Sequence, residues 1–191
     1  MSCFTSGSQL TTLRGEIPVE LLAVGDRVVT RDNGLRTIRR ISRRDFDYAQ
    51  LVALPHLQPV LVTIGALGKG LPERDMLVSP NQRLLVAPDL FPSGDVVAKG
   101  AREALIAAKN LTDHKAIRPC QSLGVSYFLV EFDRNECVLA NGIWVEAFCQ
   151  QDQSDGARRN AQRNEVQEIF PGRSKTEAGA QTSGPNSVPA A

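Results

Sequence analysis

The residue of this chain best suited to covalent chemistry is Cys3, which lies near the start of the sequence. A thiolate is a strong nucleophile, but an ordinary cysteine thiol is mostly protonated at neutral pH and needs activation. If the thiolate attacks an amide, the departing nitrogen must also gain a proton. Imidazole suits both tasks because it titrates near neutrality. The chain has two histidines, His56 and His114, and we expect both to be surface loop residues rather than catalysts.

The other three cysteines, Cys120, Cys137 and Cys149, do not point to a metal site. No pair of cysteines has the Cys-x-x-Cys spacing, and neither histidine lies at ligand spacing from a cysteine. We therefore expect these three thiols to be core or edge residues. The sequence predicts no metal and no cofactor.

The composition is that of an ordinary soluble domain: 42% of the residues are hydrophobic and 23% are charged. Lys and Arg number 22 against 21 Asp and Glu, so a formal charge of +1 favours neither nucleic acid nor a membrane surface as a partner. No apolar run approaches a membrane span, and the start lacks the layout of a secretory signal. We expect a cytoplasmic monomer, with export by a route that reads no N-terminal signal left open.

Short segments rich in β-branched and aromatic residues alternate with Gly, Pro and Asn-Gly turns, which predicts an all-β fold, a sandwich or a partly closed barrel. The expected strands are Arg27–Thr30, Arg36–Ile41, Val60–Ile64, Met76–Ser79, Arg83–Ala87, Ser126–Phe132, Glu136–Ala140 and Ile143–Phe148. Asn33-Gly34 and Asn141-Gly142 suit tight hairpins, because both residue types tolerate positive φ. The segment Ala101–Leu111 reads equally as a helix or as a strand leading into a helical turn.

Residues 1–150 and 151–191 differ in character. The second region is polar and ends in a stretch rich in Gly, Ala, Ser and Pro, so we predict one domain followed by a disordered tail. Within the tail, Val166, Ile169 and Phe170 are spaced three and four residues apart. A short helix around Asn164–Phe170 could therefore dock weakly on the domain.

Three stretches carry a family resemblance. The first runs from Cys3 to Gly34 and holds a leading Cys, a small-residue turn, a Thr and Gly25-Asp-Arg-Val28; the others are residues 64–80 and 125–148. Together they resemble the Hint domains shared by hedgehog proteins and inteins, most of all standalone bacterial members. The resemblance covers about residues 3–150. It implies a β-rich horseshoe of two pseudo-symmetric halves, with the N-terminal Cys at its centre.

In active members of that family, the thiolate attacks the carbonyl of the residue before it, and a second nucleophile resolves the resulting thioester. The family's Thr-x-x-His motif corresponds here to Ser79-Pro-Asn-Gln82. Ser79 is a conservative replacement, but Gln82 cannot accept and return a proton at neutral pH. At two further positions where the family usually carries histidine, this chain has Leu129 and Asn135.

The positions that match the family site are Cys3, Ser79, Gln82 and Asn135, and we expect impaired acyl shift there. One alternative is slow, thiol-dependent autocleavage at Ser2–Cys3. Another is polyanion binding by a β module through the arginines of 36–44, although a solvated or salt-bridged edge is the simpler interpretation.

Two absences also bear on processing. No intein-type His-Asn junction occurs near residue 150, which disfavours splicing. Only Met1 and Ser2 precede Cys3. Any partner is therefore expected to be a domain fused upstream in a longer precursor, or another protein.

Overall fold

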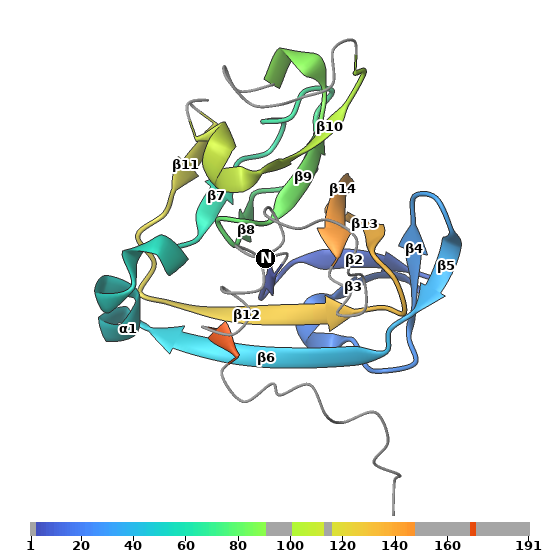
Figure 1. The fold of residues 1–191 in the computed structure, drawn as a ribbon, viewed down its shortest axis with the longest axis horizontal. Helices are drawn as coiled ribbons and strands as arrows, with labels where there is room; N and C mark the ends of the chain where they lie inside the picture. Colours follow the sequence, from blue (N-terminus) through green and yellow to red (C-terminus); the bar gives the residue numbers. More distant parts are fainter. Residues whose placement is uncertain (1–2, 91–100, 113–115, 148–168, 171–191) are drawn as a thin grey trace, which may run out of the picture.

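The fold is built almost entirely from short strands (Figure 1). The computed structural model describes residues 3–90, 101–112, 116–147 and 169–170. Its strands are β1 (Phe4–Thr5), β2 (Gln9–Thr12), β3 (Gly15–Pro18), β4 (Arg27–Thr30), β5 (Gly34–Thr37), β6 (Arg40–Asp47), β7 (Val60–Val62), β8 (Met76–Val78), β9 (Arg83–Val86), β10 (Ala104–Ala107), β11 (Ile117–Pro119), β12 (Gly124–Glu131), β13 (Glu136–Ala140) and β14 (Ile143–Ala147). The helical pieces are α1 (Tyr48–Ala53), η1 (Val19–Leu21), η2 (Pro55–Leu57), η3 (Pro88–Leu90) and η4 (Ala108–Leu111). The all-β prediction is confirmed.

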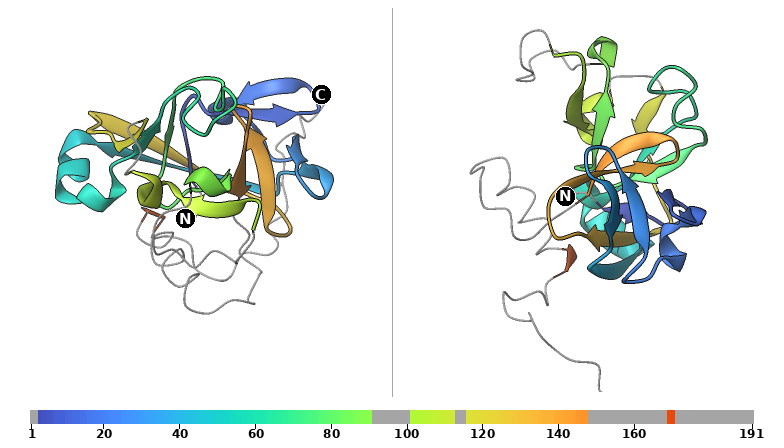
Figure 2. Two further views of the ribbon diagram at one scale, coloured as in Figure 1. Left: turned by 90° about the horizontal axis from the view of Figure 1, so that it is seen from above. Right: turned by 90° about the vertical axis from the view of Figure 1, so that its right-hand side faces the viewer.

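The strands form two sheets. One has the order β11-β7-β8-β1-β12-β6, and the other runs β10-β9-β14-β13-β2-β4-β5, with β3 paired to β2. The two-residue strand β1 lies inside the first sheet, between β8 and β12. Figure 1 shows β12 and β6 as one long antiparallel pair along the base of the molecule, and Figure 2 gives the fold from above and from the side. This order places the start of the chain in the middle of a sheet, where both neighbours can contact it.

Strand alternation divides the core into two clusters. Side chains of a strand point alternately to opposite faces. On β12, Phe128 and Val130 belong to the larger cluster, the main core, whereas Tyr127 and Leu129 belong to a smaller one. We call this second group the Cys3 cluster; its buried members are Cys3, Phe46, Leu51, Leu57, Tyr127, Leu129, Ile169 and Phe170.

Most of the predicted strands are confirmed, and two of them, Arg27–Thr30 and Glu136–Ala140, match to the residue. The strand predicted over Arg36–Ile41 is wrong. That segment contains the end of β5, a break at Ile38 and Arg39, and the start of β6. The backbone N–H of Ile38 donates to the Asp26 carbonyl, while that of Arg39 donates to the Glu131 carbonyl. The chain therefore passes from one sheet to the other here, with Ile38 buried in the main core.

The two Asn-Gly hairpins both form, with different turns. Asn141 and Gly142 have φ of 49° and 80° and make a two-residue loop between β13 and β14. In the β4–β5 hairpin, Thr30 pairs with Gly34 itself, so three residues form the loop. The ambiguous segment resolves as a strand, β10, followed by the helical turn η4.

Two residues of the predicted tail pack on the domain. Ile169 is fully buried and Phe170 is 8% exposed, both within the Cys3 cluster. Docking of these two side chains agrees with the prediction from their spacing, whereas Val166 and nearly all of residues 151–191 lie outside the described residues. Among the residues that are described, no helix is long and apolar enough to cross a membrane.

Candidate functional site

Cys3 lies immediately before β1 and is fully buried. Its backbone N–H donates to the Ser79 hydroxyl oxygen at 3.4 Å, and the Ser79 N–H donates to the Cys3 carbonyl at 3.5 Å. This pair extends the antiparallel ladder in which Phe4 faces Val78. The short strand therefore places the candidate nucleophile directly against the segment that resembles the Thr-x-x-His motif.

That segment, Ser79 to Gln82, forms a tight turn. The Gln82 N–H donates to the Ser79 carbonyl at 2.9 Å, and Pro80 occupies the second turn position, which its fixed φ favours. Two bonds anchor the turn to η4, because the N–H groups of Ala108 and Lys109 donate to the carbonyls of Gln82 and Pro80, each at 2.9 Å. The turn thus holds Gln82 in a fixed place.

The Gln82 side chain is buried, with 1% of its surface exposed. Its Nε2 donates to the Glu146 carbonyl at 2.8 Å. Its Oε1 is buried and makes no hydrogen bond to the described residues. The Glu146 carbonyl uses one of the two amide N–H donors, and the buried Oε1 is an acceptor.

On its other side, Cys3 meets apolar side chains. Leu129 is fully buried in the Cys3 cluster, as expected from the register that pairs Phe4 with Phe128. The ring of Tyr127 packs edge-on against Phe46 at 6.0 Å between centroids, and its hydroxyl donates to the Leu57 carbonyl at 2.7 Å. The neighbours of Cys3 within this cluster are thus apolar and aromatic side chains.

Asn135 lies apart from this group. It is half-buried in the turn between β12 and β13, beyond the end of the strand that carries Leu129. Its neighbour Glu136 accepts a hydrogen bond from the Asn33 amide at 2.9 Å and lies 3.6 Å from Arg36 Nε. Of the four predicted positions, the structure therefore joins Cys3, Ser79 and Gln82, and places Asn135 in a separate turn.

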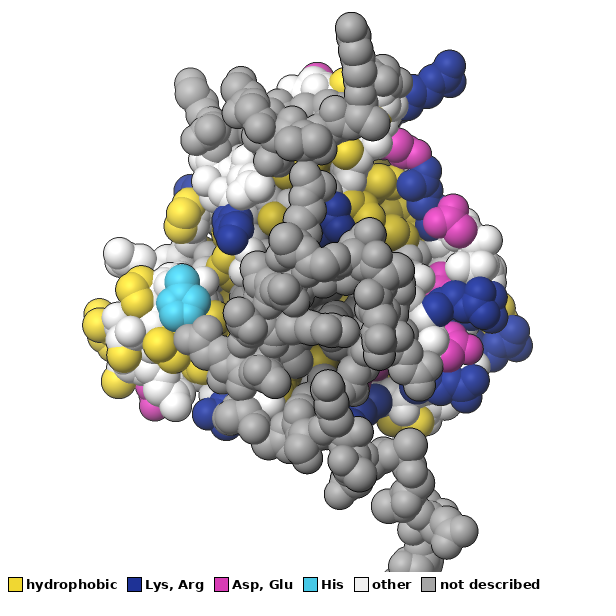
Figure 3. Space-filling model, viewed as in Figure 1, with side chains coloured by type: hydrophobic (Ala, Val, Ile, Leu, Met, Phe, Trp, Pro, Cys, Tyr) yellow, Lys and Arg dark blue, Asp and Glu magenta, His cyan; other side chains and the backbone are white. Residues whose placement is uncertain are grey.

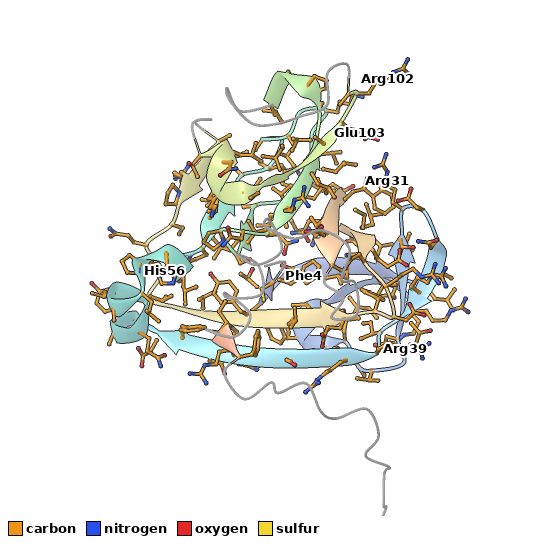
Figure 4. The ribbon with its side chains drawn as sticks, viewed as in Figure 1. Phe4, Arg31, Arg39, His56, Arg102 and Glu103 are labelled. Atoms are coloured by element: carbon orange, nitrogen blue, oxygen red, sulfur yellow. The ribbon has the colours of Figure 1, made fainter. Side chains whose placement is uncertain are left out.

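His56 does not reach the buried site. It is exposed in η2, visible at the surface near α1 in Figure 3 and well separated from Phe4 in Figure 4. The surface position expected for it is confirmed, whereas His114 lies outside the described residues. Within the described part of the chain, no group of three or more His, Cys, Asp or Glu could hold a metal ion.

The remaining cysteines agree with the prediction where they are described. Cys120 and Cys137 are half-buried, and Cys149 lies outside the described residues. Burial raises the pKa of the Cys137 thiol to about 11, with a further contribution from the carboxylates of Glu146 and Asp32. This thiol is therefore poorly suited to act as a nucleophile at neutral pH.

The arginines of residues 36–44 are largely engaged with other side chains. Arg39 and Arg43 pair with Asp133 and Asp45 at 3.8 and 2.9 Å, and Arg36 pairs with Glu136. The guanidinium groups of Arg43 and Arg44 also lie over the rings of Phe128 and Phe46, respectively. This pattern matches a salt-bridged sheet edge better than a continuous polyanion site.

Sequence reasoning missed two contacts of the site, both made by backbone carbonyl groups. The Glu146 carbonyl fixes Gln82, and the Leu77 carbonyl accepts a hydrogen bond from the Thr5 hydroxyl at 2.6 Å, next to Cys3. Every residue has a backbone carbonyl group, so no residue type in the sequence indicates that these two contacts form. Only the strand register could have revealed them.

Comparison with known proteins finds one family model and several solved structures that are similar to this chain. The model of the Hint domain family matches residues 2–152. Among solved structures, the bacterial intein-like domain from Clostridium thermocellum covers 78% of this chain and 99% of its own, at 13% identity and a TM-score of 0.44. The MchDnaB-1 intein (76% and 99%, 13% identity, TM-score 0.44) and the gp41-1 intein (78% and 100%, 12% identity, TM-score 0.41) are also similar. No curated protein matches the chain.

The family match covers most of the chain, including Cys3, the Ser79–Gln82 turn and the closing hairpin. The fold is β-rich, and it buries the leading cysteine inside a sheet against that turn. The chain belongs to the Hint domain family.

Proposed function

We propose that this Hint domain is impaired in the N–S acyl shift and serves as a binding or structural module, with a fused domain or a separate protein as its partner. The observation that carries the proposal is Gln82. It stands where the family motif has histidine, and its amide is held by the Glu146 carbonyl. An amide cannot take up and return a proton at neutral pH. Loss of one general acid or base typically costs about 10²–10⁴ in rate.

The surroundings of Cys3 support the same proposal. Leu129 gives the thiol an apolar neighbour where a histidine is usual in the family. His56 is exposed in η2 and cannot serve the buried sulfur from there. Leucine has no titratable group, so Leu129 can neither activate the thiol nor protonate the departing nitrogen, the two tasks that imidazole would perform.

The test is a full-length chain with a reporter domain fused upstream of Cys3. The fusion is incubated with dithiothreitol or hydroxylamine, which would intercept a thioester, and cleavage is followed by gel and intact mass. The matched control is Cys3→Ala. We expect both proteins to stay almost uncleaved, and rapid cleavage that Cys3→Ala abolishes would contradict the proposal.

A second candidate is slow residual autocleavage at Ser2–Cys3, favoured by the bond from the Cys3 N–H to the Ser79 hydroxyl. In this reaction the Cys3 sulfur would bond to the Ser2 carbonyl carbon, the C–N bond would break, and the nitrogen would gain a proton as an amide becomes a thioester. Water or an added thiol would then resolve the thioester. Intact mass over days should reveal slow loss of the flanking residues in the native chain but not in Cys3→Ala.

A further inference from the structure

We propose that the segment carrying Ile169 and Phe170 is an intramolecular cap that keeps the Cys3 thiol out of reach of solutes. Cys3 and Ile169 are both fully buried and Phe170 is 8% exposed, all within one cluster. In Figure 1 this segment, drawn in red, lies beside β12 and β6. It is separated from Cys3 by more than 160 residues of sequence, so its place in the same cluster is a result of tertiary packing and not of chain connectivity.

The seat of the cap is built by four elements. Phe46 comes from β6, Tyr127 and Leu129 from β12, Leu51 from α1 and Leu57 from η2. Among the side chains that contact the cap, Tyr127 carries a hydroxyl group, and this hydroxyl donates a hydrogen bond to the Leu57 carbonyl. The surface that faces Ile169 and Phe170 is therefore apolar. Packing of these two side chains on it is favoured because it removes them from water.

Leu129 links this cap to the altered site. The resemblance to active Hint domains places a histidine at this position, and an imidazole there would bring a polar nitrogen that needs a hydrogen-bond partner when buried. With leucine, the same position completes an apolar seat instead. The cap concerns access to the thiol and not the acyl shift, so either proposal can hold without the other.

The test is pulsed alkylation of the full-length chain with iodoacetamide, with the modification of Cys3 measured by peptide mass spectrometry. Cys120, half-buried and outside the Cys3 cluster, is the internal reference. The variant Ile169→Ser/Phe170→Ser should raise the ratio of Cys3 to Cys120 labelling by about tenfold or more, because Cys3 then opens locally. The control Leu13→Ser changes an exposed residue outside the cluster and should leave the ratio unchanged.

A variant that unfolds the whole domain would also raise this ratio, because Cys3 starts fully buried and Cys120 only half-buried. Only variants whose circular dichroism spectrum and urea unfolding match those of the native chain are therefore compared. Phe170→Ala, which removes one side chain, is measured in parallel, with circular dichroism to verify the fold. We expect a smaller increase in the same ratio. If folded Phe170→Ala and the double variant both keep the native ratio, Ile169 and Phe170 do not cap Cys3.

Discussion

Cys3 and Ser79 exchange two hydrogen bonds: the Cys3 N–H donates to the Ser79 hydroxyl, and the Ser79 N–H donates to the Cys3 carbonyl. The nitrogen that would have to leave in an acyl shift is thus held against a hydroxyl group. A hydroxyl positions this amide but is too weak an acid to protonate it at neutral pH. Under the proposed function, these two contacts position the Cys3 amide without supplying a proton to its nitrogen.

Restoring a titratable group at position 82 should therefore speed cleavage. In a fusion with a reporter upstream of Cys3, Gln82→His should raise the thiol-induced cleavage rate by about 10²-fold or more. The rate should change with pH around the ordinary imidazole pKa of about 6.5. Gln82→Leu, which fills similar space without a titratable nitrogen, is the control. Equal rates for the two variants would show that position 82 does not limit the reaction.

Leu129 should contribute strongly to stability. It is fully buried in the Cys3 cluster, so Leu129→Ala leaves a cavity and should lower the free energy of unfolding by about 2–5 kcal/mol. Leu123→Ala removes the same atoms from a side chain that is 84% exposed. This control should change the free energy of unfolding by less than about 0.5 kcal/mol. Urea denaturation followed by fluorescence measures both. Similar values for the two variants would mean that the cluster around Cys3 is not tightly packed.

Much of the fold could be predicted from the sequence, because strand alternation and Asn-Gly turns are local signals. The hairpin of β13 and β14 was predicted to within one residue at its far end, since Asn141-Gly142 fixes its register. β1 and β11 are too short to show alternation. The break at Ile38 depends on bonds to Asp26 and Glu131 from distant strands, and a local pattern cannot contain such bonds.

The candidate site was less accessible to sequence reasoning. The positions Cys3, Ser79 and Gln82 came from a family motif, and the structure joins them. Asn135 came from a different part of the resemblance, the closing strands, and lies in a turn beyond β12 because the chain leaves the sheet after Glu131. Ile169 belongs to the same cluster as Cys3 although the two residues are far apart in the sequence. The spacing of Ile169 and Phe170 predicted docking on the domain, but a local pattern cannot indicate where they dock.

The buried hydroxyl of Tyr127 gives a third prediction. It donates to the Leu57 carbonyl at 2.7 Å, so Tyr127→Phe leaves that carbonyl without this donor while it keeps the ring. We expect the free energy of unfolding to fall by about 1–3 kcal/mol. Tyr48→Phe, at an exposed position on α1, is the control and should have little effect. An unchanged free energy of unfolding in Tyr127→Phe would mean that a water molecule replaces the hydroxyl as the donor to the Leu57 carbonyl.

The raised pKa of Cys137 gives a prediction about pH. Burial and the nearby carboxylates of Glu146 and Asp32 bring this pKa to about 11, against about 8.5 for an ordinary thiol. The folded state therefore favours the protonated thiol. The stability that this preference contributes is complete below about pH 8.5 and is lost as the pH rises through about 11. The wild type should lose stability relative to Cys137→Ser across this range.

In the folded chain, the midpoint of the pH–rate profile for alkylation of Cys137 should lie near 11, and in the urea-unfolded chain near 8.5. The midpoint is compared instead of the alkylation rate, because burial lowers that rate at every pH. Equal midpoints in the folded and unfolded chains would show that the pKa of Cys137 is not raised.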